Sequence, residues 1–215
     1  MVIDFSTSAL IEIDAQNDFC PGGALAVAQG DEAVKPLNNL AKLFASKGGR
    51  VIATQDWHPV NHISFAASHG GKNPGDIIDL SETNAQVLWP SHCVQGSKGA
   101  DFHKELDLSP VNLILRKGFR EKLDSYSAFF ENDGKTSTGL EGFLKGLDIK
   151  TVVLGGLATD YCVLYSALDA VRLKFTTIVI KDAVRGVGYP EGSIEKAFES
   201  LEAAGVLIID SKEIQ

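Results

Sequence analysis

Short apolar segments alternate with amphipathic segments along most of the chain. Six segments are rich in Val, Ile and Leu, which is the composition of strands buried on both faces. They are residues 9–13, 51–54, 111–115, 151–155, 176–180 and 206–209. Three further segments place apolar side chains at helical spacing: residues 33–47, 160–173 and 194–204. With a shorter helix expected to end at Leu147, the pattern predicts an α/β fold: a three-layer α/β/α sandwich with a mainly parallel central sheet of about six strands.

Two long segments, residues 57–110 and 118–135, show no strong period and are rich in residues typical of loops. Loops of this length inside a compact domain are usually functional or carry short helices. The chain shows no internal repeat, no low-complexity stretch and no linker. A single domain spanning residues 1–215 is therefore expected.

Charge and cysteine content exclude several classes of protein. The formal net charge of −8 disfavours nucleic acid as a partner, because an acidic surface repels phosphate. The N-terminus lacks the pattern of a secretory signal, and no apolar run approaches the ~18 residues of a membrane span. Three widely spaced cysteines do not indicate a disulfide framework, and Cys20 and Cys93 are expected to be buried packing residues. We expect a cytoplasmic protein with no nucleic-acid or membrane partner and at least one working thiol.

Four reactive side chains lie at the ends of predicted strands. Asp14, Asp56 and Lys117 end the first three strands, and Cys162 begins the helix after the fourth. Ligands of open parallel sheets bind beyond the carboxyl ends of the strands, so these side chains are candidates for one site. Each also has an ordinary structural interpretation: a carboxylate that caps a turn, a surface lysine, or a small buried cysteine.

Cys162 is the candidate nucleophile. Thr159 or Asp160 is expected to be the N-cap of its helix, and the N–H groups there, with Lys117 nearby, would lower the pKa of the thiol. The same N–H groups could hold the oxyanion that forms when a thiolate attacks a carbonyl. Asp14 is then the candidate general base.

Asp56, His58 and His92 are candidate metal ligands. Residues i and i+2 of an extended chain point the same way, so Asp56 and His58 can reach one ion, and His92 could supply a third ligand from the long loop. One oxygen and two nitrogens suit Zn²⁺, Fe²⁺ or Mn²⁺. His62 is a candidate further ligand or supporting group. The alternative interpretation is that His58, His62 and His92 are ordinary loop histidines that bind no ion.

These residues stand in blocks that resemble the nicotinamidases of the isochorismatase-like cysteine hydrolase superfamily. The blocks occur in the family's order, span about residues 9–210 and are highly specific when taken together. They are DAQNDFCPGGAL at 14–25, QDWHP at 55–59 followed by Asn61-His62, WPSHCVQG at 89–96, Lys117-Gly118, DSYSAF at 124–129 and GLATDYCV at 156–163.

The resemblance implies a cysteine amidohydrolase that converts nicotinamide and water to nicotinate and ammonia in NAD salvage, with pyrazinamide as an expected analogue. It implies that Cys162 is the nucleophile and forms a thioester, that Asp14 accepts and later donates the proton, and that Lys117 gives electrostatic support. A cis peptide is expected before Ala158, and the N–H groups of Ala158 and Cys162 would form the oxyanion hole.

The resemblance further implies that Asp56, His58 and His92 hold one divalent ion, with Zn²⁺ expected first and Fe²⁺ or Mn²⁺ as alternatives. In the family this ion binds the pyridine nitrogen of the substrate and does not activate the nucleophile. Four residues are expected to wall the substrate pocket: Phe19, Trp89, Leu157 and Tyr161.

The sequence departs from the family pattern in places. Several extra residues precede the first strand, and residues 70–84 match only loosely, so no pocket residue is placed there. His62 matches a position that is a metal ligand in some members and not in others. Members occur as monomers and as oligomers, which leaves a homo-oligomer open.

Other functions make different demands on the sequence. A metal-free carbamoyl or amide hydrolase, or an isochorismatase of the same superfamily, would lack the Asp-x-His pair with its additional His. A non-enzymatic metal-binding or thiol redox protein would need neither Asp14 nor Lys117. It would also favour a second cysteine near Cys162, where no Cys-x-x-Cys occurs.

Overall fold

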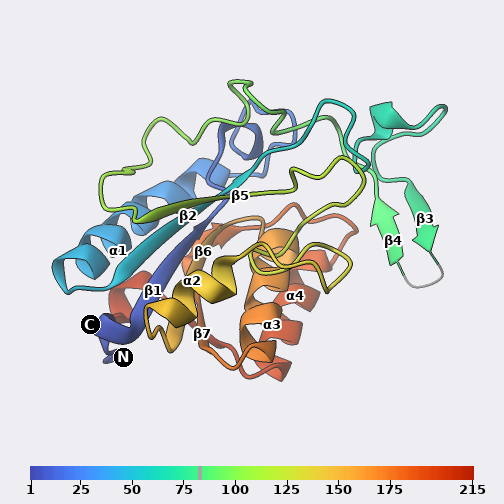
Figure 1. The fold of residues 1–215 in the computed structure, drawn as a ribbon. Coiled ribbons are helices and arrows are strands. Elements are labelled where there is room, and N and C mark those ends of the chain that lie inside the picture. The colour runs from blue at the N-terminus through green and yellow to red at the C-terminus, as the bar shows by residue number, and fades with distance from the viewer. Residues whose placement is uncertain (82–83) are drawn as a thin grey trace.

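The structure, a computed structural model that describes residues 1–81 and 84–215, is built around a six-stranded sheet (Figure 1). The strands are β1 (Ser8–Ile13), β2 (Arg50–Asp56), β5 (Leu113–Lys117), β6 (Thr151–Leu157), β7 (Thr176–Arg185) and β8 (Leu207–Ile209). They lie in the order β5-β2-β1-β6-β7-β8, and every neighbouring pair is parallel. The predicted α/β class and mainly parallel sheet are confirmed.

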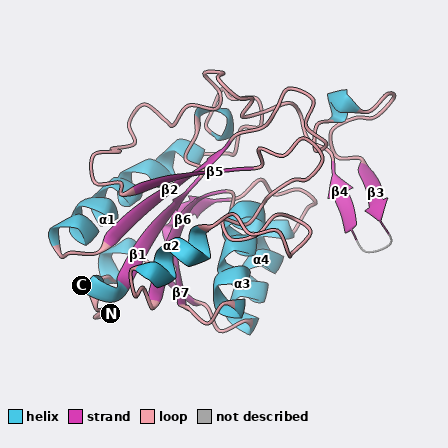
Figure 2. Ribbon diagram, in the orientation of Figure 1, coloured by secondary structure: helices cyan, strands magenta, loops and turns pink. Residues whose placement is uncertain are grey.

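Helices cover both faces of this sheet (Figure 2). One face carries α1 (Val34–Ser46), and the other carries α2 (Leu140–Gly146), α3 (Leu164–Arg172) and α4 (Ser193–Ala203). Short 3-10 segments span Phe5–Thr7, Asn17–Phe19, Gly30–Ala33, Ala66–Ser68 and Ser211–Glu213. Within the described residues, no helix combines the length and the apolar character needed to cross a membrane.

The side chains of β1 alternate between two hydrophobic cores. Leu10 belongs to the core that contains Leu37 of α1, whereas Ile11 belongs to the core that contains Leu144 of α2 and Ala167 of α3. All of these side chains are fully buried. A strand covered on both faces needs apolar residues at successive positions, which explains the continuous apolar runs in the sequence.

Some element boundaries differ from the predicted ones. β5 begins at Leu113 rather than at residue 111, because it pairs with β2 from Ile52 onward. Asn112 instead makes two hydrogen bonds with Val51: its backbone N–H donates to the Val51 carbonyl, and its side-chain oxygen accepts the Val51 N–H. β7 continues beyond residue 180 to Arg185. The other predicted strands and helices are present within a few residues of their expected ends.

An antiparallel hairpin of β3 (Ile77–Ser81) and β4 (Asn84–Val87) projects from the body of the molecule (Figure 1). It was not predicted, since residues 57–110 show no strong period. Gln86 of β4 is buried and donates to the carboxylate of Asp124 at 2.9 Å, which ties the hairpin to the loop that follows β5.

The strand order determines where the reactive side chains meet. Asp14 follows β1, while Asp56 and Lys117 are the last residues of β2 and β5. Cys162 lies just beyond β6, which is the other neighbour of β1. Because the four strands are adjacent and parallel, their carboxyl ends share one edge of the sheet.

Glu12 is an isolated carboxyl group within β1. Its side chain is fully buried, and neither carboxyl oxygen has a hydrogen-bond partner within residues 1–81 and 84–215. Burial, with a smaller contribution from the Asp107 carboxylate, raises the pKa of Glu12 to about 8. The folded protein therefore keeps Glu12 protonated at neutral pH, where an unfolded chain would ionise it.

Replacing Glu12 with Gln should change how stability depends on pH. The folded state holds the Glu12 proton up to about pH 8, and the unfolded chain loses it near the ordinary value of 4.5. The free energy of unfolding of the wild type therefore falls as pH rises between these values, by up to ~1.4 kcal/mol per pH unit. Glu12→Gln should gain stability relative to wild type across this window, measured by urea unfolding. The exposed control Glu199→Gln should not, and parallel curves for Glu12→Gln and wild type would contradict the prediction.

Candidate active site

Lys117 is the centre of a buried group of charges. Its ammonium lies 2.8 Å from Asp14 Oδ2 and donates to Asp56 Oδ1 at 2.6 Å. It also donates to the Ser125 carbonyl at 2.9 Å and to Cys162 Sγ at 3.4 Å. The side chains of Lys117 and Asp14 are both 0% exposed. The structure thus brings together the four side chains predicted at the strand ends.

The local backbone explains these positions. Asp56 and Lys117 are paired residues across β2 and β5. Asp14 directly follows β1 with a positive φ of 44°. Thr54 of β2 donates its hydroxyl to Asp14 Oδ1 at 2.6 Å and accepts the backbone N–H of Asp14 at 3.1 Å. This contact with Thr54 orients the carboxylate so that Oδ2 faces Lys117.

Burial and mutual charge set the pKa values of this group. Burial alone would lower the pKa of Lys117, but Asp14 and Asp56 outweigh it and raise that pKa well above its usual range. Burial opposes ionisation of Asp56, yet Lys117 and His58 lower its pKa. Burial raises the pKa of Asp14 to about 6, with Lys117 opposing the rise and Asp56 adding to it. Of the two carboxylates, Asp14 and Asp56, it is therefore Asp14 that can accept a proton near neutral pH.

Cys162 differs from the expectation for a thiol at a helix start. Burial raises the pKa of this thiol well above its usual range; Lys117 opposes the rise, and Asp14 and Asp56 add to it. The predicted lowering of the pKa is wrong, because one shared ammonium does not offset burial and two carboxylates. The thiol therefore needs an adjacent base, and a carboxylate oxygen of Asp14 lies within 4.8 Å of Sγ.

The turn that carries Cys162 is a π-helical turn, Thr159–Val163, between β6 and α3. The backbone N–H of Val163 donates to the Ala158 carbonyl at 3.0 Å. Ala158 occupies the cap position, and no side chain within residues 1–81 and 84–215 caps the turn, so the prediction of Thr159 or Asp160 as N-cap is wrong. The predicted cis peptide before Ala158 is present.

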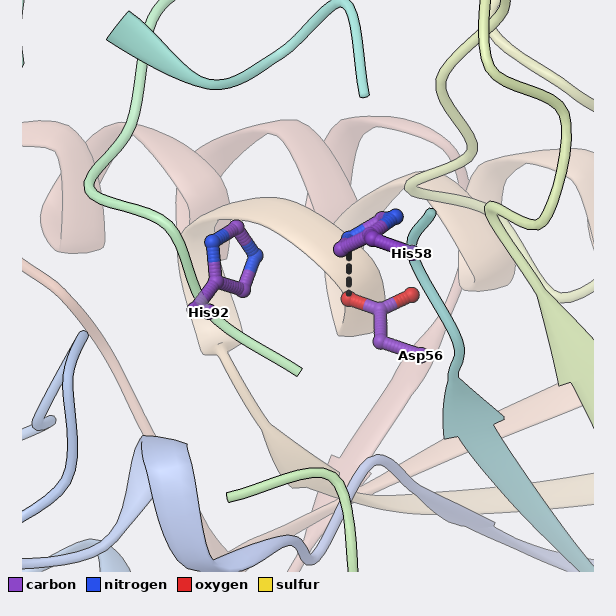
Figure 3. A group of neighbouring side chains, drawn as sticks. All are labelled: Asp56, His58 and His92. Carbon is purple, nitrogen blue, oxygen red and sulfur yellow. Dashed lines mark ion pairs between the residues drawn. The ribbon is translucent and has the colours of Figure 1, made fainter. Parts of the chain in front are cut away.

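Asp56, His58 and His92 point toward one another (Figure 3). All three are buried, and one potential ligand atom from each lies within 4.8 Å of the others. His58 Nε2 is 3.5 Å from Asp56 Oδ2, as the i, i+2 spacing predicts. His92 comes from the loop after β4. The structure brings the three predicted metal ligands to one point.

Backbone carbonyls orient both imidazole rings. His58 Nδ1 lies 2.8 Å from the Gly118 carbonyl oxygen, and His92 Nδ1 lies 2.8 Å from that of Pro90. A carbonyl can only accept, so Nδ1 carries the hydrogen in each ring and Nε2 is left for another partner. Gly118 has φ +62°, and a Cβ there would collide with the His58 ring. The close approach of backbone and imidazole therefore requires glycine.

The electrostatics at these rings favour a cation. Burial, with His58 as the next contributor, lowers the pKa of His92 to about 4. For His58 burial also acts to lower the pKa, but Asp56 outweighs it and the pKa is raised. Positive charge is thus favoured between His58 Nε2 and Asp56 Oδ2, where a metal ion could replace the proton. Two imidazole nitrogens and one carboxylate oxygen fit a divalent ion.

The ring of His62 packs against that of His58. The two rings stack with their centroids 4.2 Å apart, and His62 Nδ1 is 2.7 Å from the Ser64 hydroxyl. His62 Nε2 has no hydrogen-bond partner among the residues described and lies 4.0 Å from Asp124 Oδ1. His62 can share a metal with His58 and Asp124, a set distinct from that of Asp56, His58 and His92. Its part in binding an ion stays a prediction.

A pocket opens between Cys162 and the candidate metal ligands. Phe19, Trp89 and Tyr161 line it, as predicted for three of the four wall residues. Leu157, the fourth, is not among the lining residues; its side chain is fully buried in a hydrophobic cluster with Phe19 and Cys93. Cys93 is buried as expected.

Four lining residues were not predicted: Leu25, Asp124, Tyr126 and Val187. Three of them lie inside blocks that resemble the nicotinamidases, which was the available signal. Val187 lies outside every block, in the loop between β7 and α4. Tyr126 accepts a hydrogen bond from Trp89 Nε1 at 3.0 Å, so these two aromatic side chains of the wall hold each other in place.

Known proteins match almost the whole chain. A curated nicotinamidase of Acinetobacter baylyi is 48% identical over 206 residues, which cover 96% of this chain and 94% of that protein. A solved structure described as a nicotinamidase and pyrazinamidase of Acinetobacter baumanii has a TM-score of 0.92 and 49% identity, over 97% of this chain and 98% of its own. Pyrazinamidase of Pyrococcus horikoshii, solved in complex with zinc, has a TM-score of 0.79 and 37% identity, over 95% and 99%.

The family match covers the same part of the sequence. Residues 8–213 match the family model of the isochorismatase domain. This range contains all six strands of the central sheet and each residue of the candidate site. The buried Asp14, Lys117 and Cys162 are thus found within the matched region. The chain therefore belongs to the isochorismatase-domain family.

Proposed function

We propose that the chain is a nicotinamidase, which hydrolyses nicotinamide to nicotinate and ammonia. The observation that carries this proposal is the position of Lys117, which contacts Asp14, Asp56 and Cys162 at once. Lys117 joins a thiol, a base and a metal-ligand group into one site beside an aromatic pocket. Relatives named as nicotinamidases at 48% and 49% identity support the same amide substrate.

In the first half of the proposed reaction, an acyl group is transferred to sulfur. Asp14 accepts the proton of the Cys162 thiol, and the thiolate attacks the carbonyl carbon of the amide. Lys117 remains charged and balances the negative charge that appears on sulfur. The N–H groups of Ala158 and Cys162 are proposed to hold the oxyanion. Asp14 then gives its proton to the departing nitrogen, so ammonia leaves and a thioester remains.

In the second half, water releases the acid. Asp14 accepts a proton from water while the oxygen attacks the thioester carbonyl. The carbon–sulfur bond then breaks, nicotinic acid leaves and ionises, and the proton on Asp14 returns to the sulfur of Cys162. Every proton that Asp14 accepts is passed on, so the site returns to its starting state.

We propose that Asp56, His58 and His92 hold one divalent ion. Zinc is the first choice, because the Pyrococcus horikoshii relative was solved with zinc; Fe²⁺ and Mn²⁺ are the alternatives. When bound, the ion supplies a coordination position for the pyridine nitrogen of the substrate. The rings of Trp89 and Tyr161, edge to face at 4.9 Å, form part of the surrounding aromatic wall.

The competing functions fit the geometry less well. A metal-free amidase or an isochorismatase would not need Asp56, His58 and His92 buried within 4.8 Å of one another. A redox protein would need a second thiol beside Cys162, but Cys20 and Cys93 belong to a different hydrophobic cluster from Cys162.

The proposed reaction also suggests a setting. Nicotinate is a precursor for NAD salvage. Pyrazinamide is the proposed analogue, because it keeps a ring nitrogen two bonds from the carbon that carries the carboxamide, as in nicotinamide. We further propose a single domain of residues 1–215 that acts in the cytoplasm.

Replacing Cys162 with Ala should abolish amide hydrolysis while the fold persists, because Cys162 carries the thiol that accepts a hydrogen bond from Lys117 and lines the pocket. Ammonia release from nicotinamide measures activity, and circular dichroism measures folding. The matched control Cys20→Ala removes a buried thiol outside the site and should retain activity. Activity retained in Cys162→Ala would remove this residue from the mechanism.

Replacing Asp14 with Asn should reduce kcat by about 10²–10⁴-fold, because an amide cannot accept the thiol proton. The substitution keeps the size of the side chain, and the Thr54 contact can persist. Steady-state ammonia release gives kcat, and thermal unfolding tests for intact structure. Near wild-type turnover in a folded Asp14→Asn protein would reduce Asp14 to a structural role.

Removing the metal should damage substrate choice as well as rate. Metal-loaded enzyme should hydrolyse nicotinamide with a far higher kcat/KM than benzamide, which lacks the ring nitrogen. A substrate that leaves a polar contact of the site unfilled can lose a large factor in kcat/KM. His92→Ala should lower metal occupancy, measured by elemental analysis, and lose nicotinamide turnover. Cys162 in this variant should still react with a small alkylating agent. Equal rates for the two amides, or no effect of a chelator, would exclude a role for the ion.

A further inference from the structure

Asp160 is a buried carboxylate that the proposed reaction does not use. It is 5% exposed and immediately precedes Tyr161 and Cys162 in the π-helical turn. Its Oδ1 accepts the backbone N–H of Val187 at 2.9 Å. Its Oδ2 accepts the backbone N–H of Gly188 at 2.9 Å and the hydroxyl of Ser193 at 2.5 Å. All three donors belong to residues 187–193, the segment that leads from β7 into α4.

The neighbouring side chain adds a fourth contact to the same segment. The hydroxyl of Tyr161 donates to the Tyr189 carbonyl at 2.6 Å. The backbone can lie this close to the carboxylate because residue 186 is glycine: a Cβ there would approach Asp160 Oδ1 to 3.2 Å and would press into Ile194. Gly188 has φ +72°, a conformation that favours glycine. The segment is therefore shaped to fit around Asp160.

The segment held in this way forms part of the pocket. Val187 lines the pocket together with Cys162, Phe19 and Leu25, and it packs against the hydrophobic cluster that contains Phe19. Its backbone N–H is the group that donates to Asp160 Oδ1. The position of this apolar wall is thus tied directly to the turn that carries the nucleophile.

We infer that Asp160 is a positioning residue for the substrate: it holds Val187 against the pocket, so that the bound aromatic amide is aligned with the thiol. The inference rests on the proposed function and adds a determinant of substrate binding to it. Asp160 acts through Val187 and does not touch the reacting atoms. Its loss should weaken capture of the amide more than it slows the bond-breaking steps.

Kinetics of Asp160→Asn, Val187→Ala and the double variant test this role. An amide presents one oxygen and one NH₂ group to three donors, so Asp160→Asn must break at least one contact. KM for nicotinamide should rise on the order of tenfold in each single variant, with a much smaller change in kcat. KM of the double variant should be little higher than that of either single variant, because both substitutions disturb the same wall of the pocket. Additive effects on KM, or a loss confined to kcat, would overturn the inference.

A second measurement does not depend on catalysis. Amide hydrogen exchange at Val187 and Gly188 should become at least about tenfold faster in Asp160→Asn, because their acceptor is disturbed. Ser193→Ala, which removes one of the three donors, should give a smaller change of the same kind. The control Asp169→Asn removes a carboxylate of α3 that pairs with Arg172, and should alter neither exchange nor KM.

The two proposals fail in different ways. Wild-type protein that releases no ammonia from nicotinamide would overturn the proposed function. In a wild type that does cut nicotinamide, unchanged exchange in Asp160→Asn would overturn the positioning role alone. The rate at which iodoacetamide alkylates Cys162 should match wild type in Asp160→Asn. A large fall in that rate would mean that Asp160 acts on the nucleophile itself, and would also overturn the inference.

Discussion

The burial of Lys117 is the constraint on which the rest of the site depends. A buried ammonium is unfavourable unless it is closely paired, and removal of one partner from such a group leaves an uncompensated charge. Lys117 has two carboxylate partners, Asp14 at 2.8 Å and Asp56 at 2.6 Å. With both carboxylates ionised, the three groups carry a net charge of −1, and this buried negative charge favours a cation nearby. Asp56 Oδ1 is occupied by Lys117, so Oδ2 faces His58. The ammonium of Lys117 therefore positions both Asp14, the proposed base, and Asp56 of the candidate metal-ligand group.

Strand ends and loops contribute different parts of this site. Asp14, Asp56 and Lys117 lie on or directly after adjacent parallel strands, so their spacing is set by strand register, as in the pairing of Asp56 with Lys117. Cys162 lies in the turn after β6. The pocket walls come from loops, which hydrogen bonds must hold in place. Trp89 is held through Tyr126, and Val187 through Asp160. This division gives a rigid arrangement for proton transfer and a wall whose shape depends on a few polar contacts.

Much of the fold follows from local patterns, and the exceptions have physical causes. Continuous apolar runs identified the buried strands, but β5 lies at the edge of the sheet and alternates in burial, and the apolar Val111 led to a predicted start two residues before Leu113. The β3–β4 hairpin lies outside the main sheet and leaves no periodic signal. The N-cap prediction failed because Asp160 hydrogen-bonds residues 187–193 and not its own turn. The thiol pKa of Cys162 was predicted in the wrong direction, since burial depends on packing that a sequence does not state.

By itself the sequence determined the class of fold, the candidate residues for the chemistry and the blocks that identify the family. These properties depend on residue type and on spacing along the chain, which a sequence contains directly. Only the tertiary structure decided that one ammonium contacts Asp14, Asp56 and Cys162 together, that Leu157 lies behind the pocket, and that Val187 lines it. Each of these depends on strand order and on distances between segments far apart in the chain. Such distances are set by how the sheet and loops pack, and no local pattern of residues encodes them.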